Sequence, residues 1–360
     1  MELRHDALQV QLARTVRAVL GAGGDTWRTL ADLDVLRLSA PVDRDGLDLG
    51  LSADIMVCTE LGRALDALPG YTETVAAIAL LSDATDPEPP ARGDPAAVRN
   101  PAWPGEALAG ALTGHHRLAT AGVLTGGTLR LDERDGLHGT TAPLPRVPWA
   151  GVVALACARS TGDMLVYASL DGSAVDIESL DTLAGPSVRL HLRGAGATVL
   201  GVKDPAGTVA RVRAQARVRQ AAFLRGLTES ALITARDRVN RREQFGRRLV
   251  DFQTVSHRLA VLAAELEGVD LLVHEAAWRC DNLSDERVDA GPAPAQSLAA
   301  AAEIATRASR LAIQLHGARG LLAGTPVERA YRLATVESLR LGTPATLWRE
   351  AGRLRWHGAT

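Results

Sequence analysis

The stretch Arg238–Gln253, RVNRREQFGRRLVDFQ, lies in the middle of a long helical run and decides how the C-terminal part of the chain folds. Upstream of it, apolar residues recur at helical spacing and predict an amphipathic helix: Ala221, Leu224, Leu227, Ala231, Leu232 and Ala235. A turn is expected at Gly246. A second helix is expected to begin at Asp251, a residue suited to an N-cap.

The end of the first of these helices carries chemistry as well as structure. Arg242 offers a guanidinium fork for phosphate and Phe245 an aromatic edge for packing, with Gln244 between them. A solvated basic face on a bundle helix explains the same residues when the stretch is considered alone. The rest of the sequence has to decide between the two interpretations.

Composition favours packed helices in a chain of two or three domains. The 360 residues are 46% hydrophobic but only 3% aromatic, so Ala, Leu and Val must fill the core. The formal net charge of −2 gives no reason to expect nucleic acid or an anionic membrane as a partner. The three cysteines are far apart and lack metal-ligand spacing. Without a signal peptide or a membrane-spanning run, a cytoplasmic location is expected.

The residue pattern changes twice along the chain, which predicts three domains. Residues 1–105 are expected to form a helical domain that ends in a proline-rich connection at 83–105. Residues 106–204 contain short apolar or alternating runs between Gly, Asp and Pro, which are typical of a β domain. Residues 205–360 predict a four-helix bundle from blocks at 208–244, 251–282, 294–322 and 326–357. The expected fold class is therefore α+β and multidomain, with a barrel-like β domain between helices.

Four motifs, in this order, resemble those of the acyl-CoA dehydrogenase family. The first is an N-terminal series of Trp27, the loop DGLDLG, and Glu60-Leu61-Gly62-Arg63. The bundle then contains Arg242-x-x-Phe245-Gly246 with Phe252-Gln253, followed by Gln314-Leu315-His316-Gly317, and last Tyr331-Arg332 with Leu341-Gly342-Thr343. The resemblance covers nearly the whole chain and implies an FAD-binding protein.

The resemblance also implies an FAD-dependent oxidoreductase that takes two hydrogens from the α and β carbons of an acyl thioester. In the family a carboxylate removes the α proton, usually the Glu of an E-G-T sequence. Here that position is Leu341, which cannot accept a proton, although a positioned base contributes about 10² to 10⁴-fold to the rate. The alternative family position aligns with Ala216 and Arg217. Glu337 shares the helix face of Leu341 but lies about 5.4 Å along the axis, so a surface or capping role is the preferred interpretation.

The β domain departs from the family in the same direction. Where members carry a T-E-P-x-x-G-S-D loop around the flavin, this chain reads Thr113-Gly114-His115-His116-Arg117-Leu118. Pro143 and Pro145 stand where members place an aromatic residue and a threonine beside the flavin ring, and proline has no N–H or hydroxyl to donate. The two histidines are interpreted as solvent-facing, and no metal site is expected, because no third ligand is evident.

The family residues that remain are those that grip the ADP half of FAD from the neighbouring subunit. The resemblance implies that the cofactor-binding residues are Arg242, Gln244, Phe245, Gln314, Gly317 and Thr343. The catalytic base and much of the ring-binding set are missing, as in a base-lacking subunit of a heteromeric dehydrogenase, and some actinobacterial members form α₂β₂ assemblies. The first hypothesis is such a subunit, working with a related catalytic chain on an acyl-CoA or acyl-carrier-protein thioester.

Two alternatives stay open. One is an enzyme on the same scaffold, assembled with itself, whose chemistry is a flavin-assisted oxidation, an acyl-carrier-protein-linked desaturation or a redox-neutral rearrangement in a biosynthetic pathway. It predicts stoichiometric flavin in this chain alone. The other is a non-catalytic scaffold that has lost flavin, which the missing ring contacts favour and the retained Arg242 and Gln314 oppose. The identity of the acyl group is not predicted, because the helices that shape its pocket cannot be oriented from the sequence.

Overall fold

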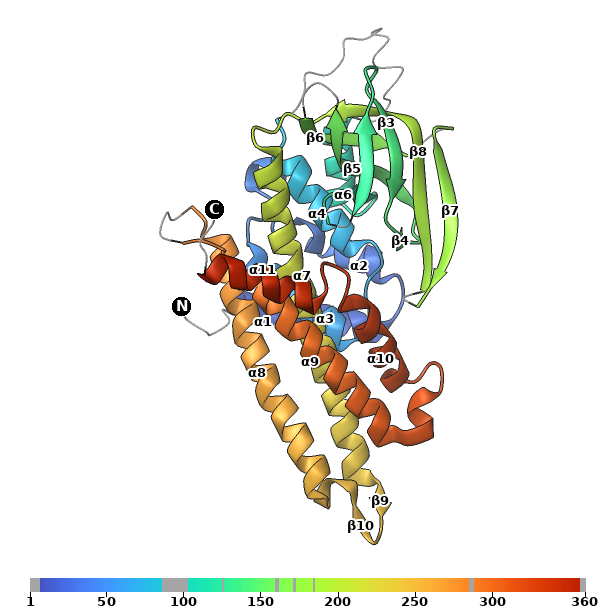
Figure 1. Cartoon of the computed structure of the whole chain (residues 1–360), viewed down its shortest axis with the longest axis vertical. Helices are drawn as coiled ribbons and strands as arrows, with labels where there is room; N and C mark the ends of the chain where they lie inside the picture. Colours follow the sequence, from blue (N-terminus) through green and yellow to red (C-terminus); the bar gives the residue numbers. More distant parts are fainter. Residues whose placement is uncertain are drawn as a thin grey trace. The chain divides into compact units, whose positions relative to one another are not determined.

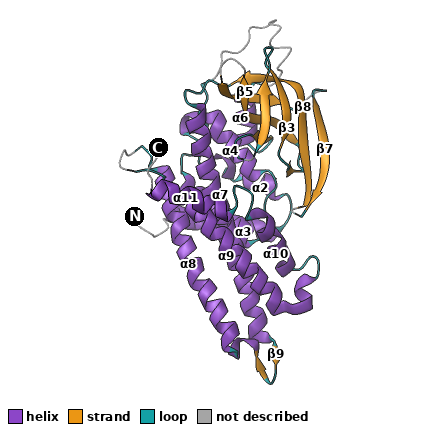
Figure 2. Cartoon of the chain, in the orientation of Figure 1, coloured by secondary structure: helices purple, strands orange, loops and turns teal. Residues whose placement is uncertain are grey.

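The predicted order of helices, then a β-sheet, then helices is confirmed (Figures 1 and 2). The computed structural model describes residues 7–85, 103–124, 126–158, 162–170, 173–183, 185–284 and 288–356. The chain forms two compact units, each built from separate segments. The sheet unit consists of residues 25–50 and 68–216, and the helical unit of residues 1–24, 51–67 and 217–360. Within the described residues, every helix is too short or too polar to cross a membrane.

The sheet unit is organised around a barrel-like sheet. Its strands are β1 (Arg117–Ala121), β2 (Gly127–Leu131), β3 (Gly136–Thr141), β4 (Leu144–Pro145), β5 (Trp149–Ala158), β6 (Gly162–Ser169), β7 (Val175–Thr182) and β8 (Gly185–Val199). The pairing order is β1-β5-β2-β3-β8-β4, and β6 pairs with both β5 and β8, which closes the sheet into a ring. Inward-facing apolar residues such as Leu137, Val152 and Leu190 are fully buried and form its core.

Short helices belong to the same unit. They are α2 (Thr26–Asp32), η1 (Val35–Arg37), η2 (Val42–Arg44), α4 (Tyr71–Ser82) and α6 (Pro104–Leu112). The assignment of residues 106–112 to β structure is wrong, because α6 begins with Pro104 and continues through Ala and Leu, both strong helix formers. The irregular connection predicted at 83–105 falls mostly outside the described residues.

The helical unit contains α1 (Ala7–Ala22), α3 (Leu51–Arg63), most of α7 (Pro205–Arg241), α8 (Gln253–Asp281), α9 (Ala293–His316), α10 (Pro326–Glu337) and α11 (Pro344–Trp356). The first three predicted blocks are confirmed as α7, α8 and α9. The fourth is wrong as a single helix, because the chain breaks at Gly342, whose φ is +129°, and Pro344 starts a new helix. Helix α7 contributes residues to both units.

Helices α3 and α7 touch backbone to backbone inside the helical unit. A Cβ added at Gly62 of α3 would lie 1.9 Å from the carbonyl oxygen of Phe223, and one added at Gly226 of α7 would lie 2.0 Å from that of Thr59. Only glycine permits this approach. At the same crossing, buried Asp54 of α3 accepts a hydrogen bond of 2.7 Å from Arg219 Nε of α7.

A buried carboxylate ties α1 to α3 a little further along. The Glu60 side chain accepts two hydrogen bonds of 2.8 Å from Arg17 and is also paired with Arg63. Burial by itself would raise the pKa of Glu60, but the hydrogen bonds from Arg17 and Arg63 outweigh burial and lower it. The Arg63 guanidinium also forms an ion pair of 2.6 Å with the Glu229 carboxylate of α7. Alternating charges therefore link α1, α3 and α7.

The N-terminus of α3 is capped by a residue far away in the sequence. Asp281, at the end of α8, accepts hydrogen bonds from the backbone N–H groups of Leu51 and Ser52 at 2.7 and 2.9 Å. A carboxylate here satisfies donors that have no partner within the helix and complements the helix dipole.

Removing this cap with Asp281→Ala is expected to cost about 0.5–2 kcal/mol of unfolding free energy, the usual range for a lost N-cap. Urea unfolding followed by circular dichroism measures the change. Asp281→Asn keeps a side-chain oxygen and is expected to retain most of the stability. Equal losses in the two variants would contradict the capping role.

Candidate functional site

A tight hairpin joins α7 to α8 at one end of the helical unit. β9 (Glu243–Gln244) pairs with β10 (Arg247–Arg248), and the turn between them consists of Phe245 and Gly246, with φ of +51° and +77°. Positive φ at both turn residues matches the twist of a two-residue hairpin, but it is unfavourable for phenylalanine. The predicted turn at Gly246 is confirmed, and it holds the Phe245 side chain 94% exposed. Strain combined with exposure is typical of a residue that contacts another molecule.

Aromatic and cationic contacts hold the hairpin against the start of α8. The Phe245 and Phe252 rings meet edge to face with centroids 6.3 Å apart, and Arg247 Cζ lies 3.9 Å from the Phe252 centroid. Asp251 was expected to cap α8, but it ends the 3₁₀ turn η3 (Leu249–Asp251) and accepts from the backbone N–H of Arg248 at 3.2 Å. Helix α8 begins at Gln253 instead.

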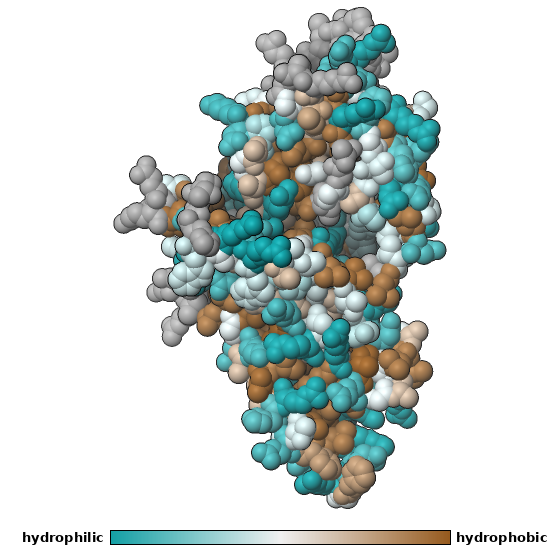
Figure 3. Space-filling view, in the orientation of Figure 1, coloured by the Kyte–Doolittle hydropathy of each residue, from teal (hydrophilic) through white to brown (hydrophobic). Residues whose placement is uncertain are grey.

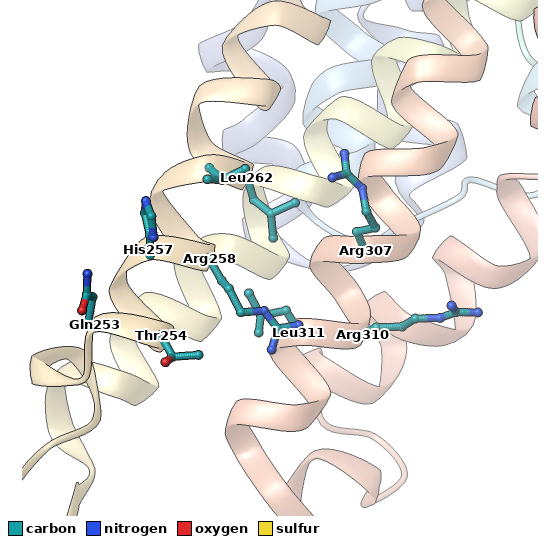
Figure 4. Close-up of a pocket in the computed structure, with 9 residues that line it drawn as sticks. Gln253, Thr254, His257, Arg258, Leu262, Arg307, Arg310 and Leu311 are labelled. Atoms are coloured by element: carbon teal, nitrogen blue, oxygen red, sulfur yellow. The ribbon is translucent and has the colours of Figure 1, made fainter.

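A basic groove of about 530 Å³ runs between α8 and α9 next to this hairpin (Figure 4). It is lined by Gln253, Thr254, His257, Arg258, Val261, Leu262, Arg307, Arg310 and Leu311. Arg258 extends from α8 towards α9, where it donates to Gln314 Oε1 at 3.1 Å. Arg307 is paired with Glu265, whereas the Arg310 guanidinium makes no ion pair within the described part of the chain. The groove therefore has an excess of positive charge.

The residues selected from the sequence are distributed around this end of the helical unit. Arg242 follows α7 directly, and Gln244 and Phe245 belong to the hairpin. Gln314 lies near the end of α9 and is held by Arg258, and Gly317 ends α9 with a φ of +60°. Thr343 is placed differently, because its hydroxyl caps α11 by accepting from the Thr346 N–H at 3.3 Å.

Sequence reasoning missed the arginines of the groove. Arg307, Arg310 and Gln314 follow one another at helical spacing, which places them on one side of α9 and was visible in the sequence. Predicting that Arg258 belongs to the groove requires knowing that α8 packs against α9, and the sequence does not show which helices pack together.

Leu341, at the position where the resemblance implies a glutamate, is buried and 5% exposed. Glu337 is buried at the end of α10, where its Oε2 accepts from Gln220 Nε2 of α7 at 2.9 Å and from Arg340 at 3.2 Å. Arg217, at the alternative family position, forms two hydrogen bonds of 2.6 and 2.9 Å with Glu350. The Glu337 and Glu350 carboxylates therefore both accept hydrogen bonds from α7.

The histidine pair lies in the sheet unit, in the loop from α6 to β1. His115 Nδ1 lies 2.9 Å from Thr113 Oγ1, and the His116 ring packs against Gly110. The backbone oxygen of Gly114, just before the two histidines, accepts a hydrogen bond from Trp27 Nε1 at 2.8 Å, which fixes the loop. Pro145 is in β4, and its carbonyl oxygen accepts from Trp149 Nε1 at 3.0 Å.

Comparisons with known proteins find likeness along the whole chain. Residues 209–353 match the family model described as acyl-CoA dehydrogenase, C-terminal domain. Acyl-CoA dehydrogenase FadE27 of Mycobacterium tuberculosis (strain ATCC 25618 / H37Rv) is 28% identical over 338 residues, 91% of this chain and 87% of that protein. A chain of the ChsE4-ChsE5 complex of M. tuberculosis has a TM-score of 0.80 at 24% identity. The match covers 98% of this chain and 98% of that chain. Glutaryl-coenzyme A dehydrogenase with glutaryl-CoA has a TM-score of 0.83 at 20% identity, covering 100% of this chain and 98% of the other.

Proposed function

Because this chain belongs to the acyl-CoA dehydrogenase family, we propose that it is a flavoprotein subunit that takes part in FAD-dependent α,β-dehydrogenation of an acyl thioester. The observation that carries the proposal is the basic groove between α8 and α9, beside a hairpin that exposes an aromatic ring. Guanidinium groups bind phosphate oxygens through short charge-assisted hydrogen bonds. Such a groove suits the pyrophosphate and adenosine of a dinucleotide.

Several residues of this chain bind different parts of the ADP half of FAD. Arg258 and Arg310 bind the pyrophosphate, and Phe245 covers an apolar face of the nucleotide. The side-chain oxygen of Gln314 accepts a hydrogen bond from Arg258. The side-chain N–H groups of Gln314 therefore remain to donate to the ligand. FAD, when bound, supplies the acceptor for the β hydride. The Thr343 hydroxyl already caps α11 by accepting from the Thr346 N–H.

The α proton requires a base from another chain. Leu341 is apolar and buried, and Glu337 is hydrogen-bonded into the junction of α7 and α10. We therefore propose that a related chain with a carboxylate at the corresponding position completes the site for an acyl-CoA or acyl-carrier-protein thioester. The ChsE4-ChsE5 complex, whose fold is similar, is by its name an assembly of two components.

Co-expression tests whether the ADP-binding residues and the catalytic base come from two different chains. This chain is produced alone and together with an acyl-CoA dehydrogenase-like chain that has glutamate at the position of Leu341. Visible flavin absorbance and thioester oxidation are expected only in the co-purified complex. Stoichiometric flavin in this chain alone favours the enzyme that assembles with itself, and a colourless complex favours the scaffold that has lost flavin.

The groove arginines are expected to dominate nucleotide binding. With ADP as the probe and calorimetry as the measurement, Arg258→Met and Arg310→Met are each expected to weaken binding roughly ten- to a hundredfold, since a hydrogen bond to a charged group is worth about 1.5–3 kcal/mol. Arg353→Met on α11 removes an exposed guanidinium outside the groove and serves as the control. Equal affinity in all three variants would place the phosphate elsewhere.

A further inference from the structure

The outer face of helix α11 exposes aromatic side chains. The inner face of the helix is packed, because Leu347 and Ala351 are buried. On the outer face lie two of the chain's six tryptophans, Trp348 at 37% and Trp356 at 79% exposed. An indole carries a large apolar surface, and the chain has only 3% aromatic residues. Two open indoles on one short helix therefore indicate a surface that another molecule covers.

The two indoles stand on either side of a gap. Trp348, Gly352 and Trp356 follow one another at intervals of four residues, which places them in one row along the helix. The row is roughly 12 Å long from the first tryptophan to the second. A Cβ added at Gly352 would meet no atom within 4 Å, so the surface between the indoles is open. This gap is suited to an apolar side chain of a partner.

Arginines flank the row of indoles. Arg349 and Arg353 are four residues apart and form a neighbouring row on the exposed face. Neither guanidinium makes an ion pair within the part of the chain that the structure describes. Arg355 lies on the other side of the row and donates to Gln296 Oε1 of α9 at 3.3 Å. Figure 3 shows strongly hydrophilic side chains gathered at the surface where Figure 1 places α11.

The nearby carboxylates do not balance these arginines. Glu350 is the one acidic residue of α11, and both of its oxygens accept hydrogen bonds from Arg217 of α7. Glu303 of α9 accepts from Trp348 Nε1 at 3.0 Å. The outer face of α11 therefore has an excess of positive charge, which attracts an acidic partner.

We propose that this face, the α11 patch of Trp348, Arg349, Gly352, Arg353 and Trp356, binds an acidic helix of a carrier protein that delivers the acyl group as a pantetheine thioester. The inference rests on the proposed function and selects a carrier-protein thioester as the substrate. Carboxylates four residues apart on the partner helix match the spacing of the arginine pair. Tryptophan and arginine are also the residues that most often dominate the energy of protein–protein binding.

The position of the α11 patch favours a carrier protein over other acidic partners. Helix α11 begins at Pro344, three residues after Leu341, where the resemblance implies the base. Trp356 lies twelve residues further, roughly 18 Å along the helix axis, and Trp348 lies closer to Leu341. An extended phosphopantetheine arm spans roughly 14 Å, because it has about as many bonds as four residues of extended chain. A carrier protein bound to the α11 patch is therefore within reach of this position.

A membrane surface is the less favoured occupant. An interfacial helix buries a continuous apolar face in the lipid, whereas the apolar face of α11 is packed inside the helical unit. Three arginines without such insertion hold a protein only weakly to an anionic surface.

Charge reversal tests the docking. A fluorescently labelled holo acyl carrier protein of net negative charge is titrated with the full-length, flavin-free chain, and binding is followed by anisotropy at low salt. The wild-type chain is expected to bind, and Arg349→Glu and Arg353→Glu are each expected to weaken binding about tenfold or more, because attraction becomes repulsion. Arg14→Glu reverses an exposed arginine of α1 and is the matched control. A wild-type chain that does not bind, or reversal variants that bind like the control, would overturn the inference.

Filling the gap between the indoles tests the apolar contact without changing a charge. Gly352→Gln is expected to weaken carrier binding about tenfold, whereas its unfolding free energy is not expected to fall, since glutamine is a better helix former than glycine. Unchanged affinity in this variant would contradict the docking geometry.

Two further outcomes separate this inference from its alternatives. Binding to phosphatidylglycerol vesicles that Arg349→Glu abolishes, without binding to the carrier protein, would assign the α11 patch to a membrane and overturn the inference. Carrier binding by a chain whose co-expressed complex stays colourless contradicts the proposed function alone. A yellow complex that oxidises an acyl-CoA, formed by a chain that does not bind the carrier protein, contradicts this inference alone.

Discussion

A Gly226→Ala variant is expected to lose about 3 kcal/mol of unfolding free energy, because overpacking a core contact costs about 1–3 kcal/mol and a clash with rigid backbone lies at the upper end of that range. The added methyl carbon would lie 2.0 Å from the carbonyl oxygen of Thr59 and 2.9 Å from the Arg63 nitrogen. Both neighbours are backbone atoms of α3, so no side chain can rotate away. The helices must separate, and separation also disrupts the packing around Gly62. Urea unfolding monitored by circular dichroism measures the loss.

Gly352→Ala is the matched control for the same chemical change. Gly352 is inside α11, and a Cβ there meets no atom within 4 Å. Alanine is favoured over glycine in a helix interior by up to about 1 kcal/mol, so this variant is expected to be slightly more stable than the wild type. If Gly226→Ala behaved like Gly352→Ala, the direct contact of α3 with α7 would be disproved.

The second large effect is expected from Asp54→Ala. The Asp54 and Arg219 side chains are only 1% and 3% exposed, and their atoms lie 2.6 Å apart at the closest approach. Removing the carboxylate leaves a guanidinium buried without its counter-charge, which typically costs about 3–5 kcal/mol. The midpoint of urea unfolding is expected to fall accordingly, while the slope of the transition stays unchanged.

Glu350→Ala tests whether burial is the reason. Glu350 also makes two hydrogen bonds to an arginine, Arg217, but its side chain is 44% exposed. Ion pairs that are open to solvent contribute up to about 1 kcal/mol. A loss for Glu350→Ala as large as that for Asp54→Ala would refute the argument from burial.

Much of the fold was accessible from periodicity. The helices α7, α8 and α9 follow from apolar residues at helical spacing, and the alternating runs between residues 117 and 199 mark the strands. The sequence ALAGAL of α6 was misassigned because small apolar residues give no contrast between the faces of a helix. The break between α10 and α11 was missed because Gly342 was considered as part of a motif and not as a residue with positive φ.

The candidate site was only partly accessible. The turn at Gly246 and the amide of Gln314 were predicted as features of the chain, but the strain at Phe245 was not, since the hairpin lacks the usual Asn-Gly signal. The bond from Arg258 to Gln314 joins residues 56 positions apart. Such a contact depends on the way two amphipathic helices pair, and periodicity within each helix does not specify the partner.

The discontinuous make-up of the helical unit has a consequence for synthesis on the ribosome. The sheet unit ends at residue 216, so all of its segments have emerged well before the chain is finished. Helix α3, in contrast, receives its cap from Asp281 and its glycine contact from α7. At translation rates of about 5–20 residues per second, the early helices α1 and α3 wait roughly ten seconds or more for these partners. During that interval their apolar faces are substrates for chaperones.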